Sequence, residues 1–173
     1  MRYGKIKYFD VANGSGVRTS LFVSGCYRHC PGCFSPETWD FEYGQEFTEK
    51  TEKEILESLK PDYISGLSVI GGEPLENRQA LIPFLRKVKN VYPNKTIWLF
   101  TGYDWTELRG IASVDSSVTD LLNLVDVLKA GDFVEDQKQV GLLFKGSKNQ
   151  ELIDMNKARA AKKKVLWRVN LDE

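Results

Sequence analysis

The sequence contains few of the residues that most often bind single metal ions or form disulfides. It has one histidine, His29, and three cysteines among 173 residues. One histidine excludes a site built from several imidazoles, and an odd number of cysteines cannot all pair within the chain. Cysteines without a disulfide framework are instead typical of metal ligands in a reducing compartment.

The sequence also lacks a net charge and a long apolar run. Lysine plus arginine and aspartate plus glutamate number 24 each, so the formal net charge is zero and no overall field attracts nucleic acid or an acidic membrane. The first ten residues have no apolar signal-peptide core, and no segment approaches the length of a membrane-spanning helix. We therefore expect a cytoplasmic protein that binds neither nucleic acid nor membrane.

The composition is that of an ordinary globular chain, with 42% hydrophobic and 28% charged residues. Its length suits one domain over residues 1–173. Basic residues are concentrated in the segment 156–173, which we expect to form a solvated face.

Short apolar runs alternate with segments of helical periodicity, which indicates an α/β fold with parallel βαβ units. The predicted strands are 5–9, 18–23, 67–70, 96–100, 124–128 and 165–169. The predicted helices are 51–59, 78–91, a short helix capped by Asp104 or Thr106, and 149–163.

Four of the predicted strands end in polar or glycine-containing segments. These segments are GCYRHC, GGEP, TGYD and KAGD. Ligands of parallel α/β folds bind at the carboxyl ends of the strands, so we expect the four segments to meet around one site.

All three cysteines, Cys26, Cys30 and Cys33, lie within eight residues in a C-x3-C-x2-C spacing. Pro31 and Gly32 favour a loop over a helix between them. Such a loop is compatible with a zinc ion that takes His29 as its fourth ligand, with a redox dithiol, or with a [4Fe–4S] cluster that has one iron free of protein. An iron without a protein ligand leaves a coordination position for a substrate or cofactor.

The string GCYRHCPGCF, at residues 25–34, resembles the cysteine motif of the radical S-adenosylmethionine superfamily. Within it, the chain is similar to the activating proteins of anaerobic ribonucleoside-triphosphate reductases, and the resemblance runs from about residue 10 to residue 155. The strings that carry it are CPGCF-S-P-ETW within residues 22–44, GGEP at 71–74, LFTGY at 99–103, VDVL at 125–128 and FKGSKNQ at 144–150.

The resemblance implies that Cys26, Cys30 and Cys33 hold three irons of a [4Fe–4S] cluster and that S-adenosylmethionine binds the fourth. It implies a radical S-adenosylmethionine activase that generates a glycyl radical on a large partner, the anaerobic reductase. A small flavodoxin-like or ferredoxin-like protein would supply the electron. Because a full eight-stranded barrel needs roughly 250 residues, we expect an incomplete TIM-type barrel or a curved, mostly parallel sheet with outer helices.

The same resemblance assigns S-adenosylmethionine to residues at the ends of two later strands. These residues are Gly71, Gly72, Glu73, Pro74, Thr101 and Gly102. The glycines would allow close backbone approach, and Glu73 would accept a hydrogen bond from the methionyl ammonium group. No further catalytic side chain is expected beyond the cluster and S-adenosylmethionine.

Other residues keep more than one interpretation. Arg18 could neutralise charge near the cluster or lie on the surface. Tyr27 and Phe34 could shield the cluster or serve ordinary packing. Trp39 is predicted to be a core aromatic. Asn149 and Gln150 fit the site, the partner surface or, for Asn149, a helix cap.

The chain departs from the family after VDVL, where an acid often precedes the glycine. Lys129 and Asp132 flank Gly131 here, and the sequence leaves open which of them, if either, replaces that acid. Two alternative functions stay open as well. One is activation of another glycyl-radical enzyme of the pyruvate formate-lyase type, and the other is a zinc-stabilised interaction module without catalysis.

Overall fold

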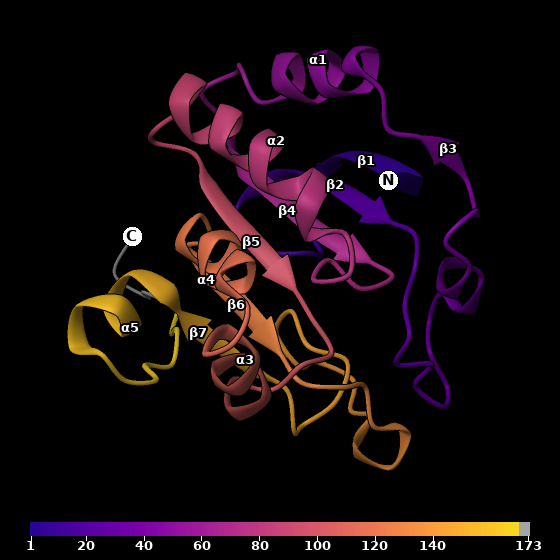
Figure 1. Ribbon diagram of the computed structural model, residues 1–173, viewed down its shortest axis with the longest axis vertical. Coiled ribbons are helices and arrows are strands. Elements are labelled where there is room, and N and C mark those ends of the chain that lie inside the picture. The colour runs from indigo at the N-terminus through magenta and orange to yellow at the C-terminus, as the bar shows by residue number, and fades with distance from the viewer. Residues whose placement is uncertain (170–173) are drawn as a thin grey trace.

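The structure, a computed structural model, describes residues 1–169. Its centre is an open seven-stranded sheet in the order β3-β1-β2-β4-β5-β6-β7 (Figure 1). The strands are β1 Arg2–Asp10, β2 Val17–Val23, β3 Gln45–Glu46, β4 Ile64–Gly71, β5 Thr96–Phe100, β6 Val127–Ala130 and β7 Glu151–Asp154.

The four central strands, β2, β4, β5 and β6, are parallel to one another. The strands β1, β3 and β7 pair antiparallel at the two sides of this unit. The predicted α/β class and largely parallel sheet are therefore confirmed, whereas a TIM-type barrel is not. In Figure 1 the arrows of the parallel strands point toward one edge of the sheet, where the long loops gather.

Within residues 1–169, five α-helices and two short 3-10 helices connect or follow the strands. They are η1 Pro36–Trp39, α1 Glu49–Ser58, α2 Arg78–Val91, α3 Trp105–Ala112, α4 Ser116–Asn123, η2 Glu135–Gln137 and α5 Met155–Ala161. Thr48 and Asp104 form capping boxes that satisfy free backbone amides at the start of α1 and α3. Of the two predicted caps of α3, the structure therefore uses Asp104.

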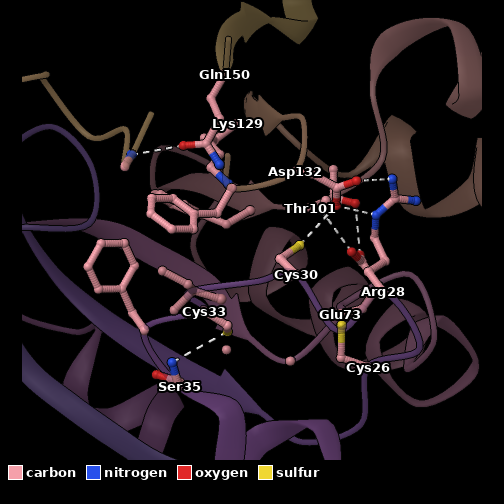
Figure 2. Close-up of a pocket in the computed structure, with 18 of the residues that line it drawn as sticks. Cys26, Arg28, Cys30, Cys33, Ser35, Glu73, Thr101, Lys129, Asp132 and Gln150 are labelled. Atoms are coloured by element: carbon pink, nitrogen blue, oxygen red, sulfur yellow. Dashed lines mark hydrogen bonds and ion pairs between the residues drawn. The ribbon is translucent and has the colours of Figure 1, made fainter. Parts of the chain in front are cut away.

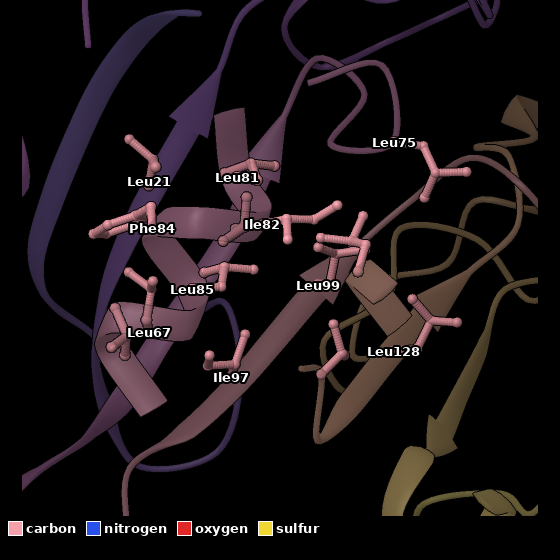
Figure 3. Close-up of a cluster of buried hydrophobic side chains, with 14 of the residues drawn as sticks. Leu21, Leu67, Leu75, Leu81, Ile82, Phe84, Leu85, Ile97, Leu99 and Leu128 are labelled. Atoms are coloured by element: carbon pink, nitrogen blue, oxygen red, sulfur yellow. The ribbon is translucent and has the colours of Figure 1, made fainter. Parts of the chain in front are cut away.

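One face of the sheet packs against helices in the main hydrophobic core. Leu67, Ile97, Leu99 and Leu128 of the strands belong to one core cluster with Leu85 of α2, and all five are fully buried (Figure 3). Alternate residues of a strand point to opposite faces. The strand residues that alternate with these core residues therefore lie on the second face of the sheet, called here the cavity face.

The cavity face has two rows of side chains that run across the strands. In the first row Ser68 of β4, Trp98 of β5 and Val127 of β6 are paired in register. The second row lies nearer the carboxyl ends of the strands and contains Phe22, Ile70, Phe100 and Lys129. This second row forms the base of the site described below.

Arg18 lies at the opposite, amino-terminal end of these strands. It is fully buried, and its guanidinium donates to the Ser68 hydroxyl at 2.8 Å and to the carbonyls of Leu67 and Thr96 at 2.9 and 2.7 Å. Burial lowers the pKa of Arg18 to about 9. Neither predicted position of Arg18, near the cluster loop or on the surface, is correct. The buried side chain of this β2 residue instead forms hydrogen bonds with β4 and β5.

Several predicted elements differ in the last third of the chain. The predicted strand 124–128 begins later, as β6. The predicted helix 149–163 is wrong at its start, because Glu151–Asp154 forms β7 and only Met155–Ala161 is helical. Residues 165–169 form no strand, although Leu166 makes an isolated bridge to Ile153.

Helix α5 includes residues 156–161 of the basic segment 156–173. Residues 170–173 of this segment lie outside the described residues. Within residues 1–169, no helix is long and apolar enough to cross a membrane.

Candidate functional site

A cavity of about 440 Å³ lies at the edge where the parallel strands end. It is lined by all three cysteines, by the GGE residues of the GGEP segment, by Thr101 and Gly102, and by residues of the segment 129–150. The four strand-end segments predicted to meet around one site are therefore brought together (Figure 2).

The two glycines of GGEP are placed against the start of the cysteine loop. Gly71 has a φ of +109°, and a Cβ on Gly72 would lie 2.5 Å from the carbonyl oxygen of Gly25. The Gly72 amide donates to the Val23 carbonyl at 2.7 Å, and the Glu73 amide donates to the Gly25 carbonyl at 2.8 Å. The close backbone approach that these glycines permit is thus the one that fixes the cysteine loop to β4.

Glu73 joins the loop after β4 to the loop after β5. Its carboxylate accepts hydrogen bonds from the Thr101 hydroxyl at 2.8 Å, the Gly102 amide at 2.8 Å and the Leu75 amide at 3.0 Å. Burial raises the pKa of Glu73 to about 7, against the effect of these donors. A carboxylate has about four acceptor positions, so one remains for a ligand. Pro74 belongs to the turn that follows and leads into α2.

Each of the three sulfurs has one or two backbone amides near it. Ser35 N lies 3.5 Å from Cys33 Sγ, and the amides of Arg28 and His29 face Cys26, where they counteract the rise in thiol pKa that burial causes. The Phe133 amide acts in the same way on Cys30.

Cys30 and Arg28 converge on Asp132 from the cysteine loop. The Cys30 thiol donates to Asp132 Oδ1 at 3.2 Å, and Arg28 forms a two-pronged ion pair with the same carboxylate (Figure 2). Two effects raise the pKa of the Cys30 thiol to about 11. Burial is the larger, and the hydrogen bond to Asp132 is the second. The Arg28 guanidinium also lies 4.4 Å from the Tyr103 ring centroid and 3.4 Å from Glu107.

Arg28 was not singled out from the sequence, although it lies between two cysteines. Its role depends on Asp132, which is 104 residues away and is brought near only by the pairing of β6 with β5. A charged residue inside a cysteine motif was the one signal that could have identified it.

The aromatic residues near the cysteines lie outside the core. Tyr27 is 72% exposed and packs on Phe41, and Phe34 is 66% exposed and packs on Phe133 at the cavity wall. His29 is exposed and stacks on Trp39 with ring centroids 4.5 Å apart. This contact favours His29 as an ordinary loop residue over His29 as the fourth ligand of a zinc ion. Trp39 is half-buried and lines the cavity, so its prediction as a core aromatic is wrong.

Gln150 holds the outer wall of the cavity. Its side chain is 2% exposed, accepts from the Gly146 and Ser147 amides and donates to the Gly131 carbonyl at 3.0 Å. Asn149 donates to the Asp132 carbonyl at 2.9 Å and is no helix cap, because β7 follows it. Both residues therefore fix the segment 131–147 beside the cysteines.

The donor set fits an iron–sulfur cluster. Three thiols from one loop line one cavity, and backbone amides point at their sulfurs, as suits thiolates that carry negative charge. Among residues 1–169, no three histidine, cysteine or acidic side chains are arranged around one shared metal ion. A cluster makes a different demand, since each thiolate binds a separate iron.

The fold and the cysteine loop are those of an iron–sulfur protein: residues 12–153 match the family model of the 4Fe-4S single cluster domain. The chain belongs to the family of anaerobic ribonucleoside-triphosphate reductase-activating proteins. It is 40% identical to the member from Vibrio cholerae over 154 residues, which cover 87% of this chain and 96% of that relative. It is 38% identical to the members from Escherichia coli K12 and Enterobacteria phage T4, again over 154 residues, which cover 96% and 93% of those relatives.

Proposed function

We propose that this chain activates an anaerobic ribonucleoside-triphosphate reductase as a radical S-adenosylmethionine enzyme. One observation carries the proposal: the three cysteines, the GGE residues and the Thr101-Gly102 turn line the same cavity at the strand ends. The names of the relatives support the reductase as partner, and the matched domain supports a [4Fe–4S] cluster.

Cys26, Cys30 and Cys33 would hold three irons, which leaves the fourth for S-adenosylmethionine. When bound, the cluster would supply the electron for reductive cleavage of S-adenosylmethionine, the chemistry by which a glycyl radical would be generated on the reductase. The residues of this chain orient the cofactor. Glu73 offers its remaining acceptor position to the methionyl ammonium, and Thr101 keeps that carboxylate in place.

Access for the two partners is consistent with the geometry. Phe34 lines the cavity and is 66% exposed, so this part of the lining is within reach of a glycine loop of a large protein. We propose a small flavodoxin-like or ferredoxin-like electron donor and a cytoplasmic location, where reduced thiols are maintained.

The test is anaerobic reconstitution with iron and sulfide, followed by electron paramagnetic resonance of the reduced protein with and without S-adenosylmethionine. We expect a reduced [4Fe–4S] signal that changes when S-adenosylmethionine is added. The variants Cys26→Ser, Cys30→Ser and Cys33→Ser should each lose the signal. A colourless protein that binds zinc with all three thiols would overturn the proposal in favour of a zinc-stabilised module.

Electron paramagnetic resonance also tests the identity of the partner. The reduced protein and S-adenosylmethionine are incubated with the anaerobic reductase or, in parallel, with pyruvate formate-lyase. A glycyl-radical signal on the reductase is expected. A signal on pyruvate formate-lyase alone would retain the chemistry and change the partner.

A further inference from the structure

An ion pair lies directly beside Cys30, one of the three thiols that line the cavity. Arg28 donates through Nε and Nη2 to the two oxygens of the Asp132 carboxylate, so the ion pair is two-pronged (Figure 2). The Cys30 thiol lies 3.2 Å from Asp132 Oδ1. Both charged side chains are partly buried, so solvent screens them less than it screens a surface pair. A change in either charge is therefore felt at the Cys30 sulfur.

The surroundings of Arg28 fix its guanidinium in this position. The guanidinium lies 4.4 Å from the Tyr103 ring centroid and 3.4 Å from Glu107 in the first turn of α3. Gly102 leaves the space that the ion pair occupies. A Cβ at Gly102 would overlap Arg28 Cδ and would lie 2.6 Å from Asp132 Oδ1. The loop after β5 is therefore shaped around the ion pair.

Asp132 has a structural role that explains its place beside a thiol. Its carbonyl accepts from the Asn149 side chain at 2.9 Å, and its carboxylate contacts the cysteine loop through Arg28 and Cys30. Asp132 thus connects the wall segment 131–147 with the loop that carries the cysteines. Across residues 1–169, no other carboxylate accepts a hydrogen bond from a cysteine thiol.

The charge of this carboxylate opposes what an iron–sulfur site needs. Iron binds cysteine as the thiolate, so a bound cluster has negative charge where the Cys30 thiol now donates to Asp132. Reduction adds one more electron. Because net charge is one of the factors that set the potential of a cluster, a nearby negative charge disfavours reduction and a positive charge favours it. Asp132 alone would therefore make a cluster harder to reduce, and Arg28 cancels its charge.

We propose that Arg28 keeps the cluster reducible by neutralising Asp132, which can then hold the cavity wall beside Cys30 without lowering the reduction potential. Arg28 is a positioning residue, because it acts on the cluster through Asp132. The cluster held by Cys26, Cys30 and Cys33 belongs to the proposed function, so this proposal rests on that function and deepens it. Asp132, whose role the sequence left open, becomes part of the cluster environment.

Other charged side chains near the cysteines belong to different parts of the site. They are Glu73, Lys129 and Lys145 in the cavity lining, and Glu135 beside Gly32. Across residues 1–169, none of them forms a hydrogen bond or ion pair with Arg28 or Asp132. Variants of the ion pair leave these other charges unchanged. A shift in potential can therefore be assigned to Arg28 and Asp132.

The experiment is a potentiometric titration of the anaerobically reconstituted protein at one fixed pH, without S-adenosylmethionine, followed by electron paramagnetic resonance of the reduced cluster. Arg28→Gln leaves the Asp132 carboxylate uncompensated and should lower the midpoint potential. Asp132→Asn leaves the guanidinium uncompensated and should raise it. Each shift should correspond to a roughly threefold to tenfold change in the ratio of reduced to oxidised cluster, which is about 30–60 mV for one electron. The double variant Arg28→Gln/Asp132→Asn should return close to the wild-type potential, because the two positions again have no net charge.

Two further variants serve as controls. Arg109→Gln removes a positive charge from an exposed position on α3, outside the cavity lining, and should leave the potential unchanged. Arg28→Lys keeps the charge next to Asp132 and should stay closer to wild type than Arg28→Gln does. If Arg28→Gln does not retain a cluster, Asp132→Asn and Arg28→Lys decide the question, since the first has to raise the potential and the second has to keep it.

Opposite shifts in the two single variants, with cancellation in the double variant, would support the proposal, because the loss of a merely structural contact does not change sign with the charge that is removed. Equal potentials in wild type and both single variants overturn it, as does a shift of the same sign in both. A shift in Arg109→Gln as large as that in Arg28→Gln assigns the effect to the overall charge of the protein and also overturns it. A wild-type protein that assembles no cluster, or whose cluster accepts no electron, overturns the proposed function itself and this proposal with it.

Discussion

The Thr101 hydroxyl donates a 2.8 Å hydrogen bond to the Glu73 carboxylate, and both side chains are only 1% exposed. The two residues lie in the loops that follow the neighbouring parallel strands β4 and β5, so this bond joins two of the loops that line the cavity. A buried carboxylate that loses a donor keeps its desolvation cost. The bond therefore has a measurable role in the stability of the protein as well as in its site.

Replacement of Thr101 by valine should destabilise the cluster-free protein by roughly 1–3 kcal/mol, because Glu73 loses one of its donors. Urea unfolding under anaerobic conditions measures the change. Thr106→Val, at an exposed position on α3, is the matched control and should stay within about 0.5 kcal/mol of wild type. Equal stability of the two variants would show that the Thr101 bond contributes nothing.

Gly72→Ala should displace the cysteine loop, because the added Cβ would lie 2.5 Å from the Gly25 carbonyl oxygen. We expect a loss of about 1–3 kcal/mol, as for overpacking, together with reduced iron content after reconstitution. Gly110→Ala is the control. Nothing lies within 4 Å of its Cβ position, so it should stabilise α3 by about 0.5–1 kcal/mol. Normal cluster assembly in Gly72→Ala would contradict the prediction.

Asp132→Asn should make a bound cluster more labile. The substitution removes the charge that pairs with Arg28 and that accepts from the Cys30 thiol in the cluster-free state. Residues that hold metal ligands in place typically contribute a factor of roughly 10–100 in metal affinity. The rate at which an iron chelator bleaches the visible absorbance provides the measurement.

Glu107→Gln is the comparison for Asp132→Asn. Glu107 lies 3.4 Å from the same guanidinium, but its side chain is 42% exposed and solvent weakens the pair. We expect a much smaller effect on bleaching. An identical rate in both variants would mean that Asp132 has no special role.

The acid stability of the protein should depend on Asp10. This carboxylate is fully buried; burial alone would raise its pKa, but hydrogen bonds from Lys7, Ser20, Asn13 and the Ala12 amide lower it to about 2. The pKa in the folded state lies below the unfolded value of about 3.8. The stabilisation is therefore complete above the unfolded pKa and is lost as the pH falls toward 2.

Unfolding by urea at pH 5 and at pH 2.5 tests this dependence. Wild type should lose roughly 1.5 kcal/mol more than Asp10→Asn across that interval, since one pKa unit corresponds to about 1.4 kcal/mol. Asp62→Asn, at an exposed aspartate, should follow wild type. Parallel pH profiles for wild type and Asp10→Asn would rule out the assignment.

Sequence reasoning worked best where the signal is local and periodic. The predicted helix 78–91 and strand 96–100 match α2 and β5 in both bounds. The four strand-end segments also converge as expected, because parallel strands in one sheet end at the same edge.

It failed where a long-range contact decides the structure. The ELID residues of β7 become a strand only because they pair antiparallel with β6, and no local pattern indicated this. Helix α4 was missed, although Asp115 caps it and Val118 and Leu121 provide its buried face. Its short length made the signal weak. The position of Arg18 was predicted wrongly because its charge suggested exposure. The carbonyls that accept its hydrogen bonds are distant in sequence and lie near it only in the folded sheet.

The order in which the cavity walls are synthesised has a consequence for its loading with iron. The three thiols, within residues 26–33, are synthesised early, whereas the wall held by Gln150 is made more than a hundred residues later. For most of translation the cysteine loop has no enclosure and no Asp132 beside it. A nascent chain therefore carries three thiols before the wall held by Gln150 has been made.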